Sequence, residues 1–237
     1  MALESFNNEQ QATSVRGGKR SSQISENLRR QIILGLLIPN ESLRELDLAQ
    51  HFKSSQSTVR EALLVLQDEG LVNRIPHRGT HVSECLAEDM VELLHLRHDI
   101  ETRGILRGIE RYDRLTHRAL TDLVDQMVAA ARSEDEYALS QLDCQFHMRI
   151  YEDAGLTGVQ PVLRRCIVHN HRYKILKSER GRSLLFAAER HIPILEALES
   201  GDVNKAVAAL SHHINTIVDF GPHLLDPSKI KRVHDEI

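Results

Sequence analysis

One carboxylate and one imidazole stand at a spacing that places both on the same face of a helix. Asp143 and His147 are four residues apart, and they lie beside an apolar stripe formed by Leu142, Phe146 and Ile150. Side chains at this spacing are neighbours on a helix surface. The pair therefore has the chemistry of a hydrogen-bonded couple or of half a metal site.

Two later histidines share the apolar faces of their own helical segments. His191 lies on the apolar face of segment 183–199, and His213 on that of segment 202–219. Each follows one apolar residue by three positions and precedes the next by four, which is helical spacing. The neighbouring His212 points elsewhere. An Asp and three His from three segments are thus expected to lean toward one core.

The chemistry of this Asp and these three His depends on whether their side chains lie close together. Taken singly, each is explained as a satisfied core residue, because buried polar groups need partners. Taken together, one carboxylate and three imidazoles suit a borderline divalent cation such as Zn²⁺, Ni²⁺ or Mn²⁺. Neutral imidazoles around a divalent cation and one Asp leave a net charge of about +1. Four protein ligands also leave coordination positions that a small carboxylate can fill.

The chain after residue 88 is expected to be entirely helical, because no strand-like alternation competes. Cap or stop residues separate the segments. The expected helices are 88–111, 116–132, 136–154, 157–178, 183–199 and 202–219. Pro193 lies inside one of them and disfavours helix at Ile192, so that helix is expected to kink or restart there. Among the four candidate ligands, His191 depends most on this backbone.

A different device is predicted near the N-terminus. A short helical pattern, 45–52, meets a polar turn at 53–55, and a second helical pattern follows. That second helix has one apolar stripe and ends at Gly70. A hairpin with a basic tip, 76–79, comes next. A helix pair followed by a small basic hairpin is the order of a winged helix-turn-helix, which lays one helix in the DNA major groove.

The side chains expected to face DNA come from the second helix and from the hairpin tip. Ser55 is also a suitable N-cap for that helix, and Gln56 favours adenine by its bidentate geometry. The expected set is Ser55, Gln56, Thr58 and Arg60 from the helix, with His77, Arg78 and Gly79 from the tip.

The N-terminal segment resembles the GntR family of bacterial transcription regulators over about 60 residues. The resemblance is carried by the runs Val59-Arg60-Glu61-Ala62-Leu63, Glu69-Gly70-Leu71-Val72 and Arg78-Gly79, among others. Two departures stand out. Asn40 replaces a usual Gly and can adopt the same left-handed conformation. The turn Lys53-Ser54-Ser55-Gln56 replaces a usual Gly-Val-Ser-Arg, so the relatives' operator sequences do not transfer.

Residues 89–219 resemble the FadR-type C-terminal ligand-binding domain of that family. Among metal-binding members, the positions that match the four candidate ligands hold the cation: Asp143, His147, His191 and His213. The resemblance also extends to Glu92-Leu93 and Arg97 in the first helix of the domain. It implies that Arg97 contacts an anionic effector, and the alternative is a salt bridge on the helix surface or between helices.

The composition agrees with a DNA reader joined to a regulatory domain. Residues 14–60 hold eight Lys and Arg against four Asp and Glu, whereas residues 84–237 hold 20 against 25. A basic N-terminal segment followed by an acidic remainder favours a nucleic-acid partner for the N-terminal segment alone. Cys85, Cys144 and Cys166 are scattered, which favours reduced thiols in the cytoplasm and argues against a cysteine zinc site. No apolar run is long enough to span a membrane.

These observations give one organisation and one leading function. The expected fold is mostly α, with an N-terminal winged helix-turn-helix and a C-terminal all-helical antiparallel bundle. The parts are a mobile tail (1–20), the DNA-binding domain (21–83), a hinge (84–88), the metal- and effector-binding domain (89–220) and a C-terminal tail (221–237).

The leading hypothesis is a cytoplasmic, homodimeric transcription regulator rather than an enzyme. It binds double-stranded operator DNA at an inverted repeat, and a small carboxylate modulates it at the metal site. Two alternatives use the same Asp/His cluster, namely a metal-dependent enzyme and a direct metal sensor. No H-E-x-x-H motif supports the enzyme, and an enzyme would leave the winged helix unexplained.

Overall fold

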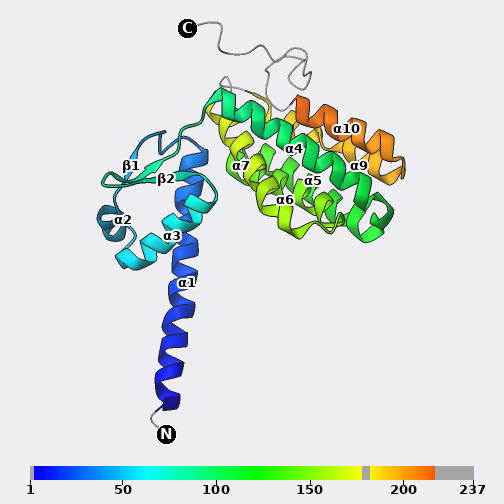
Figure 1. Ribbon diagram of the computed structural model, residues 1–237. Helices are drawn as coiled ribbons and strands as arrows, with labels where there is room; N and C mark the ends of the chain where they lie inside the picture. The colour runs from blue at the N-terminus through cyan, green and yellow to red at the C-terminus, as the bar shows by residue number, and fades with distance from the viewer. Residues whose placement is uncertain (1–2, 178–181, 217–237) are drawn as a thin grey trace, which may run out of the picture. The chain divides into compact units, whose positions relative to one another are not determined.

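The protein divides into two compact units, residues 1–85 and 86–237, in a computed structural model (Figure 1). The structure describes residues 3–177 and 182–216. The expected C-terminal tail, 221–237, lies outside the described residues. The predicted fold class is confirmed: helices dominate, and a small antiparallel sheet follows the helix-turn-helix.

The first unit packs three helices against a three-stranded sheet. Its helices are α1 (Leu3–Ile33), α2 (Glu45–His51) and α3 (Gln56–Asp68), and its strands are β1 (Ser42–Leu43), β2 (Val72–Ile75) and β3 (Gly79–Val82). The sheet order is β1-β3-β2, with both pairs antiparallel. Strands β2 and β3 are the predicted hairpin, whereas β1 was not predicted.

The core of this unit is the apolar stripe of α3 set against α1. Val59, Ala62, Leu63 and Leu66 are the buried residues of α3, which is the predicted stripe. Helix α1 begins at Leu3, within the segment expected to be a tail. The expected mobility of residues 1–20 stays a prediction. Arg29 binds Glu69 through two hydrogen bonds of 2.7 and 2.8 Å, which join α1 to the end of α3.

Backbone conformation explains the two departures from the usual family sequence. Asn40 has a φ of 67°, as expected for a residue in place of Gly. Lys53, in the turn between α2 and α3, has a φ of 48°. This left-handed region favours Gly, so a Lys there is strained. The turn thus has a left-handed backbone at a residue that suits this conformation less well than Gly does.

The second unit is a helical bundle. Its helices are α4 (Ala87–Gly108), α5 (Arg114–Arg132), α6 (Glu136–Glu152), α7 (Gln160–Lys177), α8 (Leu184–Glu189), α9 (Ile192–Glu199) and α10 (Val203–Asn215). Short 3₁₀ turns precede α5 (Ile109–Arg111) and α7 (Thr157–Val159). Helix α4 packs against α6, α7 and α10, and α5 packs against α6, α8 and α9. The first helix of the unit, α4, therefore contacts the last, α10, as well as α6 and α7 from the middle of its sequence.

The structure divides the expected helical segment 183–199 into α8 and α9. Pro193 lies in the first turn of α9, where its missing N–H costs least. His191 is the N-cap residue of α9 and stays buried at the break. The predicted restart at Pro193 is thus confirmed.

Candidate functional site

The four candidate metal ligands meet in the interior of the helical unit. Asp143 and His147 come from α6, His191 from the α8–α9 junction and His213 from α10. One ligand atom from each lies within 4.8 Å of the others, and all four side chains are buried. His191 Nε2 lies 3.1 Å from Asp143 Oδ1, and His147 Nε2 lies 3.3 Å from His213 Nε2. Helix spacing alone predicted this set.

N-cap residues fix the register of the helices that present these ligands. Asp135 accepts a hydrogen bond from the Ala138 N–H and starts α6. Asp202 accepts hydrogen bonds from two backbone N–H groups at the start of α10. This register buries His213 and leaves His212 exposed, as predicted.

Hydrogen bonds on the far side of two imidazoles determine which nitrogen faces the cluster. His147 Nδ1 lies 2.6 Å from Glu101 Oε2, and His191 Nδ1 lies 3.0 Å from the Ala188 carbonyl oxygen. A neutral imidazole that donates from Nδ1 has only a lone pair at Nε2. In that tautomer the Nε2 lone pair of His191 faces Asp143 Oδ1 at 3.1 Å. A cation fits between these acceptors, and the outer hydrogen bonds are those that orient metal ligands.

Two members of this network were not predicted from the sequence. Glu101 of α4 is buried and holds His147, and His171 of α7 lies 2.8 Å from Asp143 Oδ2 through its Nε2. Glu101 lies four residues after Arg97, a spacing that could have indicated an ion pair. Nothing in the sequence distinguishes His171 from the other histidines of this unit.

Arg97 is fully buried beside the cluster. Its Nε donates to Glu101 Oε1 at 2.6 Å, and its Nη2 lies 4.0 Å from Asp143 Oδ2. Its two terminal nitrogens have no hydrogen-bond partner among the described residues. Arg97 therefore makes a buried ion pair within α4 and a longer one with Asp143 of α6, while the outer edge of the guanidinium keeps donors that an anion can use.

Burial and neighbouring charge set the protonation states of the cluster. Burial opposes ionisation of Asp143, but His171 and His147 hold the pKa of its carboxyl well below the usual range. Burial lowers the pKa of His213 well below that of an ordinary histidine, and His191 and His147 add to the effect. Burial also lowers the pKa of His147. The imidazoles of His147 and His213 are therefore neutral at neutral pH, the form that binds a metal.

A second candidate site lies in the first unit, at the start of α3. Ser55 is the N-cap of α3, as predicted, and accepts a hydrogen bond from the Thr58 N–H at 3.2 Å. Its Oγ also lies 2.8 Å from Thr58 Oγ1. Gln56 is exposed beside them. The hydroxyls of Ser55 and Thr58 thus shape the helix end, and Gln56 has the freer side chain.

Arg60 is exposed on α3 and paired with a carboxylate of α2. Its Nη2 lies 2.7 Å from Glu45 Oε2, and its Nε lies 3.1 and 3.2 Å from the two Glu45 oxygens. The hydrogen bond from Arg60, with its charge, lowers the pKa of Glu45. Sequence analysis predicted Arg60 at this surface and missed its partner.

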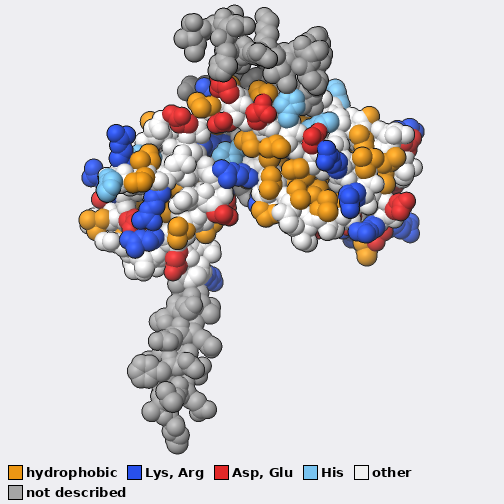
Figure 2. All heavy atoms as spheres, viewed as in Figure 1, with side chains coloured by type: hydrophobic (Ala, Val, Ile, Leu, Met, Phe, Trp, Pro, Cys, Tyr) orange, Lys and Arg blue, Asp and Glu red, His pale blue; other side chains and the backbone are white. Residues whose placement is uncertain are grey.

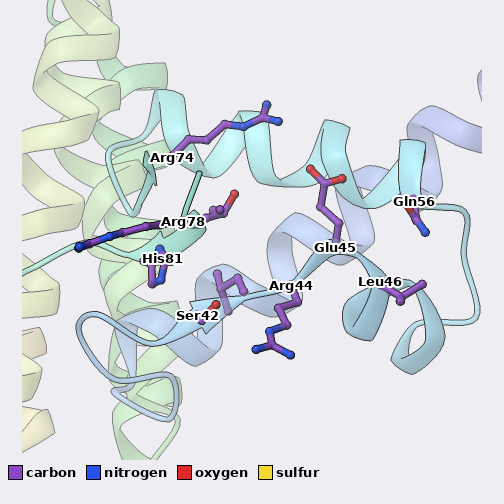
Figure 3. Close-up of a pocket in the computed structure, with 11 residues that line it drawn as sticks. Ser42, Arg44, Glu45, Leu46, Gln56, Arg74, Arg78 and His81 are labelled. Carbon is purple, nitrogen blue, oxygen red and sulfur yellow. The ribbon is translucent and has the colours of Figure 1, made fainter. Parts of the chain in front are cut away.

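The wing stands across a concavity from α2 and the start of α3 (Figure 3). Arg78 and Gly79 line this concavity, and sequence analysis missed two further arginines there, Arg44 and Arg74. His77, at the tip, has a φ of 61° and is exposed. Figure 2 shows Lys and Arg side chains gathered on the visible face of this unit. The surface is thus concave and basic, which suits a phosphate backbone.

No helix among the described residues is both long and apolar enough to cross a membrane.

Comparison with known proteins supports a transcription regulator. A transcriptional repressor of Paenarthrobacter nicotinovorans named for a D-xylose utilization operon is 28% identical over 82% of this chain and 85% of its own. The repressor RspR of Escherichia coli K12 is 23% identical over 83% and 86% of the two chains. The structure of E. coli McbR/YncC has a TM-score of 0.69 at 20% identity, covering 82% of this chain and 93% of that one, and shows the same fold.

Two family models cover most of the chain. Residues 20–82 match the bacterial regulatory proteins of the gntR family, and residues 92–216 match the FCD domain. The first match spans the helix-turn-helix and wing, and the second spans the helices that carry the Asp/His cluster. The protein belongs to the GntR family of bacterial transcription regulators and carries an FCD ligand-binding domain, so it is a regulator and not an enzyme.

Proposed function

We propose that this regulator binds an inverted-repeat operator as a cytoplasmic homodimer and responds to a small organic acid at a metal site in its FCD domain. The observation that carries the proposal is the buried cluster of four ligands beside an arginine with unused donors. The cluster supplies a place for a cation, and the arginine supplies a contact for an anion.

Asp143, His147, His191 and His213 would hold one divalent cation. Zn²⁺, Ni²⁺ and Mn²⁺ each accept this donor set. When bound, the cation supplies positive charge and open coordination positions. Glu101 and Arg97 form a buried ion pair whose charges cancel, so the site keeps a net charge of about +1. Such a site favours an anion, and a planar guanidinium binds a carboxylate in a bidentate manner.

Calorimetry tests the effector half of the proposal. Hydroxy, keto, sugar and dicarboxylic acids would be titrated into metal-loaded and chelated protein, and into metal-loaded Arg97→Lys. We expect at least one acid to bind the loaded wild type and to lose affinity both on chelation and in the variant. Equal binding after chelation would contradict contact between acid and metal. Binding only of uncharged ligands would contradict the acid itself.

The DNA-binding half places α3 in the major groove and the wing on the backbone. We expect Arg60→Ala to weaken operator binding while the melting temperature stays unchanged. Gln67→Ala is the matched control, because Gln67 is also exposed on α3 but lies near its far end. Fluorescence anisotropy with a duplex selected from a random library by the wild type measures both. Unchanged affinity in Arg60→Ala would remove α3 as the reader.

A homodimer supplies the two heads that an inverted repeat needs. Figure 2 shows hydrophobic side chains gathered on the visible face of the helical unit. Exposed hydrophobic side chains of this unit include Leu96 and Leu106 of α4 and Val162 of α7. A surface of this kind supports association of two copies. Sedimentation equilibrium would show twice the chain mass, and a monomer at micromolar concentration would contradict the dimer.

A further inference from the structure

A single carboxylate faces the basic concavity of the DNA-binding unit and touches the arginine proposed to contact DNA. We infer that Glu45 is a positioning residue for Arg60, and that it adds to discrimination between DNA sequences rather than to overall DNA affinity. The inference rests on the proposed role of α3 as the DNA reader.

The geometry of the pair divides the donors of Arg60 between two partners. A guanidinium has five N–H groups in one plane. Glu45 engages Nε and one side of Nη2, which leaves the two N–H groups of Nη1 and one of Nη2. These remaining donors form the outer edge, which is the edge that binds guanine O6 and N7 or a phosphate in a bidentate manner. Glu45 thus orients the guanidinium of Arg60 and leaves the donors of its outer edge available to DNA.

The two partners differ in how firmly they are held. The side chain of Glu45 is 23% exposed, whereas that of Arg60 is 52% exposed. Glu45 is the first residue of α2, and α2 packs directly on α3. Figure 3 shows its side chain reaching from the start of α2 toward α3. The carboxylate is therefore a fixed point that restrains an otherwise mobile side chain.

The charge around Glu45 argues against a role in attracting DNA. Arg44, Arg74 and Arg78 line the same concavity. A carboxylate among them weakens phosphate attraction, which supplies most sequence-independent affinity. Its contribution is then expected in the difference between sequences, where the orientation of a base contact matters. The lowered pKa of Glu45, caused first by the hydrogen bond from Arg60, keeps it ionised at neutral pH.

The chain offers a matched control in the same helical turn. Asp47 also lies in the first turn of α2, but it is exposed, and the side-chain hydrogen bonds of Arg60 go to Glu45 instead. Glu45→Gln and Asp47→Asn remove the same charge from the same helix end. Glu45→Asp keeps the charge and shortens the side chain by one methylene. The three variants separate charge, helix-end and positioning effects.

The experiment measures affinity for two duplexes with the full-length protein. One duplex is selected from a random library by the wild type, and the other is the same duplex with both half-sites scrambled. We expect Glu45→Gln to bind the scrambled duplex more tightly than the wild type does. We expect its preference for the selected duplex to fall by roughly fivefold or more, the low end of what one oriented base contact contributes. Glu45→Asp should lose preference too, and Asp47→Asn should keep it.

Three results would overturn the inference. Equal loss of preference in Glu45→Gln and Asp47→Asn would assign the effect to charge at the helix end. Full preference in Glu45→Asp would remove any need for the exact position. A gain in affinity for both duplexes by the same factor in Glu45→Gln would make Glu45 a competitor of DNA instead. If Arg60→Ala also left the selected duplex bound at wild-type affinity, the proposed DNA reader itself would fail.

Discussion

Asp143 has the most connected side chain of the Asp/His cluster. One oxygen faces His191, and the other lies 2.8 Å from His171 and 3.7 Å from His147. A carboxylate held from several sides keeps its ionised form and a fixed orientation. Both properties favour a metal ligand. Of these three neighbours, His147 and His191 are candidate ligands themselves, and His171 orients Asp143 from outside the ligand set.

Substitutions at His213 and at His212 distinguish the candidate ligand from a neighbouring histidine outside the site. We expect His213→Ala to lower metal content sharply, because one of four buried ligands is lost. We expect His212→Ala to keep wild-type metal content, because His212 is exposed. Elemental analysis of purified proteins gives both values. Equal metal content in wild type and His213→Ala would contradict the site, and equal loss in both variants would point to an incidental surface metal.

Acidification should release the metal. Only neutral imidazoles bind it, and burial lowers the pKa of His147 and His213 below the ordinary value of about 6.5. Protons therefore compete with the metal only below that pH. In the metal-free protein, His147 and His213 are protonated at a higher pH in the unfolded chain than in the folded protein. The free energy of unfolding therefore falls as pH falls. Dialysis between pH 8 and 5 would show metal retained above about 6.5 and lost below; retention independent of pH would contradict imidazole ligation.

The residues of the cluster divide into those that the sequence predicts and those that it does not. Helical spacing predicted all four candidate ligands, because a period of 3.6 fixes which side chains share a buried face. Three partner residues were not predicted: Glu101 and His171 beside the cluster, and Glu45 beside Arg60 in the DNA-binding unit. Each contacts a residue on another helix, and the choice of partner depends on how helices pack rather than on spacing within one helix.

At the scale of elements, close approach of α4 and α6 holds the cluster's framework together. A Cβ at Gly104 of α4 would lie 2.6 Å from the ring of Tyr151 on α6, which is buried. Gly104 lies one turn after Glu101, which holds His147. The distance between α4 and α6 is therefore set by a residue with no side chain.

Gly104→Ala should push these helices apart. We expect it to lower the free energy of unfolding by about 1–3 kcal/mol, the usual cost of overpacking a core. Gly158→Ala is the control, because nothing lies within 4 Å of a Cβ there. Chemical denaturation measures both variants. A loss of stability in Gly158→Ala as large as that in Gly104→Ala would contradict the packing argument.

Most elements follow from patterns within the sequence, and the exceptions have physical causes. Helices α4 to α7 lie within a few residues of their expected bounds. The strand β1 has only two residues, so it shows no alternation, and its pairing with β3 joins residues far apart in the sequence. Segment 183–199 has one apolar stripe but two helices, because Pro193 restarts the backbone without disturbing which residues are buried.

At the scale of the whole molecule, the two candidate sites lie in different units. The first holds the basic concavity, and the second holds the buried Asp/His cluster. Regulation requires that the occupancy of one site change the affinity of the other. Coupling between two sites in a protein is typically about 1–3 kcal/mol, roughly a 5- to 150-fold change in affinity. The proposed function needs an effect of this size.

Operator affinity with and without the acid is the most direct test of that coupling. Metal-loaded wild type and His213→Ala would be titrated with the selected duplex, each with and without the acid identified by calorimetry. We expect the acid to change the affinity of the loaded wild type by roughly 5- to 150-fold, and to leave the variant unchanged. An equal change in both proteins would contradict regulation through the Asp/His cluster. A full change produced by metal alone, with none added by any acid, would contradict the acid as effector and identify the protein as a metal sensor.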